Sequence, residues 1–126
     1  MKTEVYSNIK SILYFLKEEL ENNIQFIESE IIELTEPSMM GNSGLYYHLE
    51  TDSSGIAVFF WDSGVFEIST DVVVLEREDN VFFSYVPNNE LKQEYPRESL
   101  ILFREKIKEL LSLLKETYPN IRTVVT

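Results

Sequence analysis

The chain has 126 residues, 44% of them hydrophobic and 13% aromatic, which corresponds to one domain that can bury a core without disulfides or metal. Eleven basic against 22 acidic residues give a formal net charge of −11. This charge argues against binding to nucleic acid or anionic lipid and favours a basic partner. Cysteine is absent, which excludes thiol chemistry, disulfides, cysteine-based zinc sites and cysteine lipidation.

The N-terminal segment does not have the pattern of a secretory signal, because Glu4, Lys10 and Lys17 interrupt its apolar residues. The apolar run at residues 56–61 is among the longest in the chain, and it is far shorter than the ~20 residues of a membrane-spanning helix. We therefore expect a cytoplasmic protein that does not bind membranes.

Residues 3–34 carry apolar side chains at steps of three and four, from Val5 to Leu34, and this spacing predicts an amphipathic helix. A continuous helix would be about 48 Å long, whereas a compact chain of this size has a radius of gyration of roughly 14 Å. We expect a bend or break at the weak helix formers Asn22 and Asn23, or a helix end that protrudes.

Helical periodicity ends at residues 36–44, where Pro37 and two glycines predict a loop. Residues 45–86 then form short β-branched and aromatic runs separated by turn residues, which predicts an antiparallel meander. The connections are too short for parallel crossovers. Because the break at 70–71 is weak, residues 65–76 could be one bulged strand, leaving four strands. The five predicted strands are 45–51, 56–61, 65–69, 72–76 and 81–86.

After a polar connection, an apolar stripe predicts a second helix at residues 97–117, which ends before Pro119. The tail, residues 119–126, is expected either to fray or to add a short strand. The sequence therefore predicts a single domain over residues 1–126 with an α+β fold. In this fold two amphipathic helices pack on a four- or five-stranded antiparallel β-meander.

The residue inventory points away from catalysis. His48 is the only histidine, and we interpret it as a solvated or hydrogen-bonded strand residue, because triads and histidine-rich metal sites need partners that are absent. Glycine-rich phosphate loops are missing, and residues 76–80 lack the order of a calcium loop. The many carboxylates leave a glycosidase-type acid–base pair open, since it needs only two. We predict no enzyme, no cofactor and no metal.

Acidic side chains are concentrated in the second half of the first predicted helix and at the ends of the predicted strands. A merely solvated surface explains this distribution as well as a binding surface does. As a binding surface, it would speed association with a basic protein and select among partners. The acidic partner-binding residues predicted on this ground are Asp62, Glu67, Asp71, Glu76, Glu78 and Asp79.

Trp61 ends an apolar strand and leads into the turn Asp62-Ser63-Gly64. In this turn Gly64 can take a positive φ, and Asp62 can bond to nearby backbone amides. Packing in the core or at a sheet edge is the commoner role of such a tryptophan. With its ring exposed beside the turn, Trp61 would be an interface anchor, and we include it among the partner-binding residues.

Residues 58–68, VFFWDSGVFEI, resemble the Trp-x-Ser-Gly hairpin of the TriTu family of bacterial immunity proteins, which belong to polymorphic-toxin and contact-dependent growth inhibition systems. The order of helix, meander and helix is also similar, loosely over residues 45–115. The resemblance implies a small cytoplasmic protein that binds a cognate toxin domain stoichiometrically and blocks its active site or an essential surface. Such a domain is usually a nuclease or another cytotoxic enzyme. The motif positions here are Trp61, Asp62 and Gly64.

Two other classes of function fit the same sequence. An acidic adaptor domain could act as a homodimer, through the first helix or through an exposed strand edge such as residues 121–125. A small enzyme or ligand carrier could instead hold a pocket between the sheet and the helices. The aromatic residues predicted to line such a pocket are Tyr46, Tyr47, Phe59, Tyr85 and Tyr95.

Overall fold

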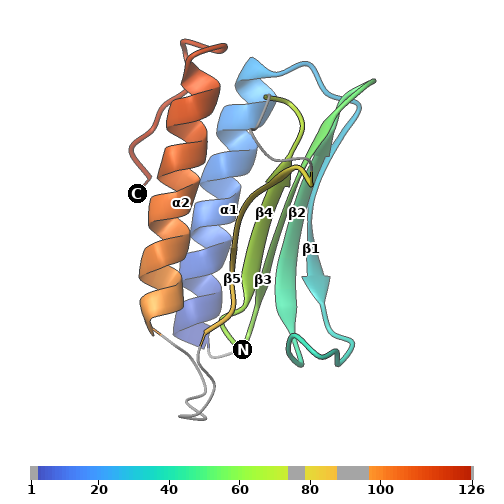
Figure 1. Cartoon of the computed structure of the whole chain (residues 1–126), viewed down its shortest axis with the longest axis vertical. Helices are drawn as coiled ribbons and strands as arrows, with labels where there is room; N and C mark the ends of the chain where they lie inside the picture. Colours follow the sequence, from blue (N-terminus) through green and yellow to red (C-terminus); the bar gives the residue numbers. More distant parts are fainter. Residues whose placement is uncertain (1–2, 74–78, 88–96, 126) are drawn as a thin grey trace.

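The computed structural model describes residues 3–73, 79–87 and 97–125 and has two layers (Figure 1). Helices α1 (Thr3–Asn23) and α2 (Arg97–Lys115) lie side by side on one face of a five-stranded sheet. The strands follow one another across the sheet in chain order, and each neighbouring pair is antiparallel. The predicted α+β fold, two helices on an antiparallel meander, is confirmed. The strands are β1 (Glu28–Leu34), β2 (Gly44–Glu50), β3 (Gly55–Trp61), β4 (Phe66–Thr70) and β5 (Val81–Tyr85).

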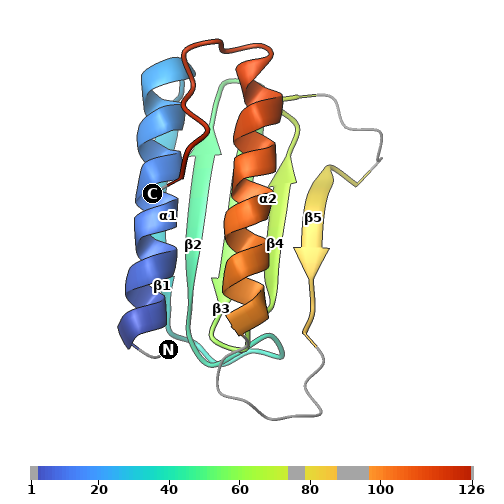
Figure 2. The same cartoon turned by 90° about the vertical axis from the view of Figure 1, so that its left-hand side faces the viewer.

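The core lies between the two layers. The helices contribute apolar stripes with steps of three and four, while β2, β3 and β4 contribute alternate residues. Figure 2 shows α1 over β1 and β2, and α2 over the other half of the sheet. The rings of Phe60 and Phe66 meet Phe103 edge-on, with centroids 5.1 and 5.2 Å away. These contacts join α2 to β3 and β4 and add to the hydrophobic burial.

The prediction of one helix over residues 3–34 was wrong in its second half. The expected break at Asn22 and Asn23 is confirmed, because α1 ends at Asn23. There the Asn23 side-chain amide donates to the carbonyl of Glu19 one turn earlier at 2.8 Å, and the N–H of Ile24 donates to the carbonyl of Leu20 at 2.8 Å. The chain then reverses and returns as the edge strand β1.

The segment Glu28–Leu34 satisfies two patterns at once. Its apolar residues continue the helical spacing of α1, but its side chains also alternate between the two faces of a strand. In the structure Ile31 packs against the core, and its neighbours Glu30 and Ile32 are exposed. Pairing with β2 over seven residues decides between the patterns, because it supplies hydrogen bonds and cross-strand contacts that local spacing does not reveal.

The predicted strand at residues 72–76 was wrong where the structure describes it. Strand β4 ends at Thr70, and the Thr70 hydroxyl accepts the backbone N–H of Val72 at 3.0 Å, which starts a bend. Residues 74–76 lie outside the described residues. The single bulged strand over 65–76 was also wrong, because the irregularity lies between Ile68 and Ser69 in the pairing of β4 with β5. The number of five strands holds because β1 takes the place of the fifth.

The C-terminal tail neither frays nor forms a strand over residues 119–125. Ile121 and Val125 are buried in the core. The backbone N–H of Arg122 donates to Glu19 Oε1 at 2.6 Å, and its Nε and Nη2 donate to Oε2 at 2.9 and 2.8 Å. Glu19 lies on α1 and is only 3% exposed. Burial raises the pKa of its carboxyl, but the hydrogen bonds and charge of Arg122 outweigh burial and lower the pKa overall.

We expect Glu19→Gln to destabilise the protein by about 1–2 kcal/mol, because the charge-assisted hydrogen bonds that hold the tail are weakened. The pKa of Glu19 is lower in the folded state, so this stabilisation is present above the unfolded carboxyl pKa and is lost as pH falls through the folded pKa. Urea titrations at several pH values measure it: wild type and variant should differ at neutral pH and converge in acid. A constant difference at all pH values would contradict the assignment. The control variant is Glu18→Gln, which removes a second carboxylate near the same guanidinium: Glu18 Oε1 lies 3.7 Å from Arg122 Nη2.

Candidate functional site

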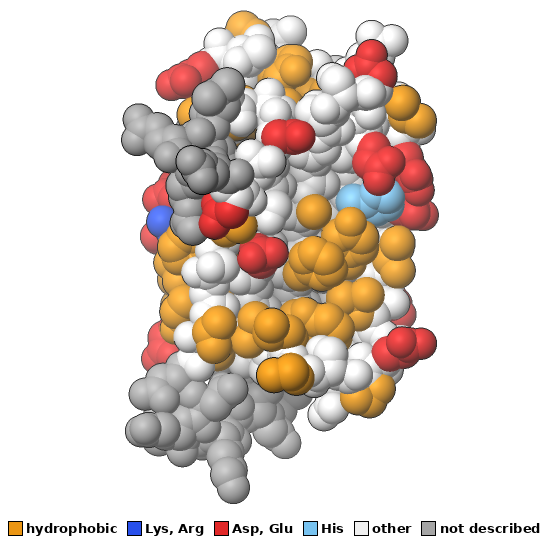
Figure 3. Space-filling model, turned by 45° about the vertical axis from the view of Figure 1, so that its right-hand side comes forward, with side chains coloured by type: hydrophobic (Ala, Val, Ile, Leu, Met, Phe, Trp, Pro, Cys, Tyr) orange, Lys and Arg blue, Asp and Glu red, His pale blue; other side chains and the backbone are white. Residues whose placement is uncertain are grey.

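The face of the sheet that points away from the helices, here called the outer face, is covered by neither helix (Figure 1). Strand alternation and register place Ile32, Tyr46, Phe59 and Glu67 in one row across β1 to β4. Figure 3 shows hydrophobic side chains gathered over this side of the molecule, with acidic side chains beside and among them. The outer face is therefore partly apolar and bordered by negative charge.

Three aromatic residues, Tyr46, Phe59 and Trp61, form what we call the aromatic band. The rings of Tyr46 and Phe59 stack with centroids 4.3 Å apart and an interplanar angle of 18°. Trp61 is partly exposed, and its ring lies against Gly41, in the loop before β2, and Gly44, the first residue of β2. A Cβ at Gly41 or Gly44 would be 3.4 or 3.1 Å from Trp61 Cε3. One side of the Trp61 ring is thus packed against these two glycines, and another part of it is accessible to solvent.

The turn after Trp61 is formed as predicted, but Asp62 bonds to backbone amides of a loop about twenty positions earlier in the chain and not to those of the turn. Gly64 has φ 90°, and its N–H donates to the carbonyl of Trp61 at 2.9 Å. The carboxylate of Asp62 accepts the backbone N–H groups of Asn42 and Ser43 at 3.0 and 3.2 Å. Asp62 therefore holds the loop before β2 in place, so its oxygens are engaged within the fold.

The other acidic residues predicted from the sequence are placed in different parts of the molecule. Glu67 lies on the outer face, opposite Phe59. Asp71 is exposed just after β4, and its Oδ1 accepts the N–H of Gly55 at 2.7 Å. Asp79 is exposed before β5, where it accepts the N–H of Val81 at 3.1 Å. Glu76 and Glu78 lie outside the described residues. Of the predicted set, the structure thus brings Trp61 and Glu67 together on the outer face.

The acids of the first predicted helix do not all lie on one side of the molecule, as a single negative surface would require. Glu19 and Glu21 lie on α1 and bond to Arg122 and Lys17. Glu33 points to the helix side of β1, where it bonds to the Tyr6 hydroxyl and lies 3.8 Å from Lys10 Nζ. Glu28 and Glu30 lie on the outer face instead. The chain reversal after α1 divides these acids between the two sides of the molecule.

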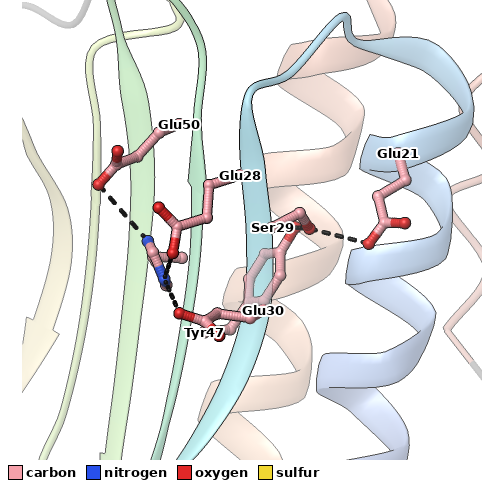
Figure 4. A network of polar contacts seen from close by, with 7 residues as sticks. Glu21, Glu28, Ser29, Glu30, Tyr47 and Glu50 are labelled. Atoms are coloured by element: carbon pink, nitrogen blue, oxygen red, sulfur yellow. Dashed lines mark hydrogen bonds and ion pairs between the residues drawn. The ribbon is translucent and has the colours of Figure 1, made fainter.

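Sequence reasoning missed a group of four residues on the outer face, which we call the glutamate–histidine cluster. It consists of Glu28 and Glu30 on β1 and of His48 and Glu50 on β2 (Figure 4). His48 Nε2 lies 3.0 Å from Glu30 Oε1 and 3.6 Å from Glu28 Oε1, and Nδ1 lies 3.6 Å from Glu50 Oε1. The Glu-x-Glu and His-x-Glu spacings would have predicted it, had residues 28–34 been interpreted as a strand.

Two protonation equilibria of the cluster are perturbed by their neighbours. A hydrogen bond with Glu30 raises the pKa of Glu28, while hydrogen bonds with His48 and Glu28 lower the pKa of Glu30. Burial and the nearby glutamates raise the pKa of Tyr46, whose ring stacks on His48 at 5.3 Å. The prediction that His48 is hydrogen-bonded is confirmed, but it is 8% exposed and so not solvated.

The predicted pocket between sheet and helices is not built by the five aromatic residues named for it. Tyr46 and Phe59 lie on the outer face, while Tyr47 is fully buried on the other. Tyr85 packs beside Phe66, and Tyr95 lies outside the described residues.

The Tyr47 hydroxyl shares a hydrogen bond with Ser29 Oγ at 2.9 Å, and Ser29 donates to Glu21 on α1 (Figure 4). Burial, the main cause, raises the pKa of Tyr47 to about 12.

Neither described helix combines the length and apolar character that a bilayer crossing requires. Comparison with protein-family models, with curated protein sequences and with solved structures gave no match.

Proposed function

We propose that this protein binds a basic protein partner through its outer face. The observation that carries this proposal is the aromatic band, Tyr46, Phe59 and Trp61, on a sheet face that the helices do not cover and that acidic residues border. Aromatic residues supply most of the energy at the centre of many interfaces, and charges at the rim steer association.

The distribution of charge along the chain supports a basic partner. No lysine or arginine occurs between Lys17 and Arg77, a stretch that contains all of β1 to β4. The described basic residues lie on the helices and in the tail, on the opposite side of the molecule from the outer face. The charged side chains of β1 to β4 are therefore all acidic apart from His48. The partly exposed aromatic rings of the outer face can also accept lysine or arginine side chains of a partner.

The proposed partner is a bacterial toxin domain, which the protein neutralises stoichiometrically in the cytoplasm as an immunity protein. The resemblance of residues 58–68 to the TriTu hairpin supports this identity, and these residues form the end of β3, the turn and the start of β4. A nuclease toxin carries positive surface to hold its substrate. An acidic surface with an aromatic centre complements such an enzyme.

The test is binding to the C-terminal domain encoded by the reading frame immediately upstream. Glu50→Lys with Glu67→Lys reverses two charges on the outer face, and Glu105→Lys with Glu116→Lys makes the same change in net charge on the helix side. We expect the outer-face variant to associate about tenfold more slowly in low salt, with the control close to wild type. Surface plasmon resonance at several salt concentrations measures both rates.

Equal effects of the two double variants would show that net charge, and not the outer face, matters. An association rate that salt does not change would rule out electrostatic steering. If the upstream domain does not bind the wild-type protein at all, the toxin is not the partner.

One observation favours a second candidate, self-association as an adaptor. Strand β1 is an edge strand, and its own Ile32 is 38% exposed. Edge strands with exposed apolar residues readily pair with another chain. Light scattering on the isolated protein separates the two functions, because the adaptor requires a dimer without any partner, whereas the immunity protein does not.

A further inference from the structure

The glutamate–histidine cluster has the composition and spacing of a metal site. Because Glu30 pairs with His48 and Glu28 with Glu50, all four side chains extend from the same face of two adjacent strands. One carboxylate oxygen of Glu28, one of Glu30 and His48 Nε2 all lie within 4.8 Å of one another. In Figure 4 the carboxylates of Glu28 and Glu30 approach one nitrogen of the imidazole, Nε2, while that of Glu50 approaches the other, Nδ1.

The distances from Nε2 to the two carboxylates are close to those between ligands around one ion. Zinc binds histidine nitrogen and carboxylate oxygen at about 2.0–2.2 Å, which in a tetrahedron places the ligand atoms about 3.3–3.6 Å apart. His48 Nε2 is 3.0 Å from Glu30 Oε1 and 3.6 Å from Glu28 Oε1. Both glutamate side chains are about half exposed, so they can rotate toward an ion while β1 and β2 stay paired in register.

His48 provides an independent indication. The residue is 92% buried, and the ring of Tyr46 stacks almost parallel to it, with an interplanar angle of 5°. Its Nδ1 is buried and has no hydrogen-bond partner among the described residues, although Glu50 Oε1 lies 3.6 Å away. An imidazole that ligates a metal through one nitrogen usually donates its other N–H to a carboxylate. Glu50 is placed to take this role and to direct the Nε2 lone pair toward Glu28 and Glu30.

We propose that Glu28, Glu30 and His48 bind a divalent transition-metal ion, best matched by Zn²⁺, with Glu50 orienting the imidazole. One nitrogen and two oxygen ligands suit such an ion, whereas Ca²⁺ and Mg²⁺ favour oxygen alone. Two carboxylates balance its charge, and water completes the coordination. The bound ion would tie the edge strand β1 to β2.

The experiment is a titration of the isolated protein, purified without a histidine tag, with Zn²⁺ alone. Calorimetry measures stoichiometry and affinity, and NMR follows the imidazole protons, which are unambiguous because the chain has one histidine. We expect one ion per chain and a shift of the His48 resonances. His48→Gln should weaken binding by at least about a hundredfold, and Glu50→Gln by about tenfold.

Glu30→Gln tests the site without touching a buried side chain, and it should also weaken binding at least about tenfold. Glu67→Gln removes the same charge from the outer face outside the cluster and should bind Zn²⁺ like wild type. Circular dichroism checks that each variant is folded. Wild-type protein that does not bind Zn²⁺, or His48→Gln and Glu30→Gln that bind it as well as Glu67→Gln does, would overturn the proposal. The proposed partner plays no part in this test, so the two proposals fail separately.

Discussion

Phe59→Ser is expected to weaken binding to the proposed basic partner by about a hundredfold, roughly 2.7 kcal/mol, which is the effect of losing an interface hot spot. Phe59 lies at the centre of the aromatic band, stacked on Tyr46 and opposite Glu67. Its ring is on the outer face, so the change removes contact area for a partner and leaves the core between the layers intact. Calorimetry with the upstream toxin domain measures the affinity.

Tyr14→Ser is the matched control for this prediction. Tyr14 is also an aromatic residue at the surface, 52% exposed, but it lies on α1 on the other side of the molecule. We expect Tyr14→Ser to leave the affinity within about twofold of wild type. An affinity of Phe59→Ser equal to that of Tyr14→Ser would mean that the partner binds elsewhere.

Gly44→Ala is expected to lower the free energy of unfolding by about 2–3 kcal/mol, because the added methyl group has no space. A Cβ at Gly44 would lie 2.7 Å from the carbonyl oxygen of Phe60 and 3.2 Å from Trp61 Cα. Gly44 pairs with Trp61 at the end of the β2–β3 ladder. Both of these atoms belong to the backbone of β3, so β2 and β3 must move apart at this point to make room for the methyl group. Urea denaturation, followed by the fluorescence of the single tryptophan, measures the loss.

Gly41→Ala distinguishes a backbone obstacle from a side-chain one. A Cβ at Gly41 would lie 2.4 Å from Asp62 Oδ1, which is the end of a side chain that can rotate. The expected loss is about 1 kcal/mol, because that rotation weakens the Asp62 hydrogen bond to Asn42. If Gly41→Ala destabilises the protein more than Gly44→Ala, the close approach of Gly44 to the backbone of β3 is not the tighter of the two contacts.

The elements that were predicted correctly have signals contained within a few neighbouring residues. The turn at Gly64 follows from a glycine that can take positive φ, and α2 follows from an apolar stripe without competing alternation. The end of α1 follows from two weak helix formers. Each of these signals is local, and in each case the tertiary contacts favour the same conformation as the local sequence.

The candidate site depended on one assignment that local spacing could not settle. With residues 28–34 treated as helix, Glu28 and Glu30 belong to a helix face, far from His48. Once this segment pairs with β2, the same glutamates come within 3.6 Å of the imidazole. The salt bridge between Glu19 and Arg122 joins residues 103 positions apart, and a single sequence contains no signal for such a pair.

The sequence by itself determined the α+β class, the two amphipathic helices, the antiparallel connections and the excess of acidic over basic residues in the first two thirds of the chain. These properties depend on composition, on periodicity and on the length of connections. Only the tertiary structure decided which segment forms the edge strand, which face the aromatic band occupies and which acids meet His48. The physical reason is that strand pairing and burial stabilise one of several locally acceptable conformations, and their partners are distant in the chain.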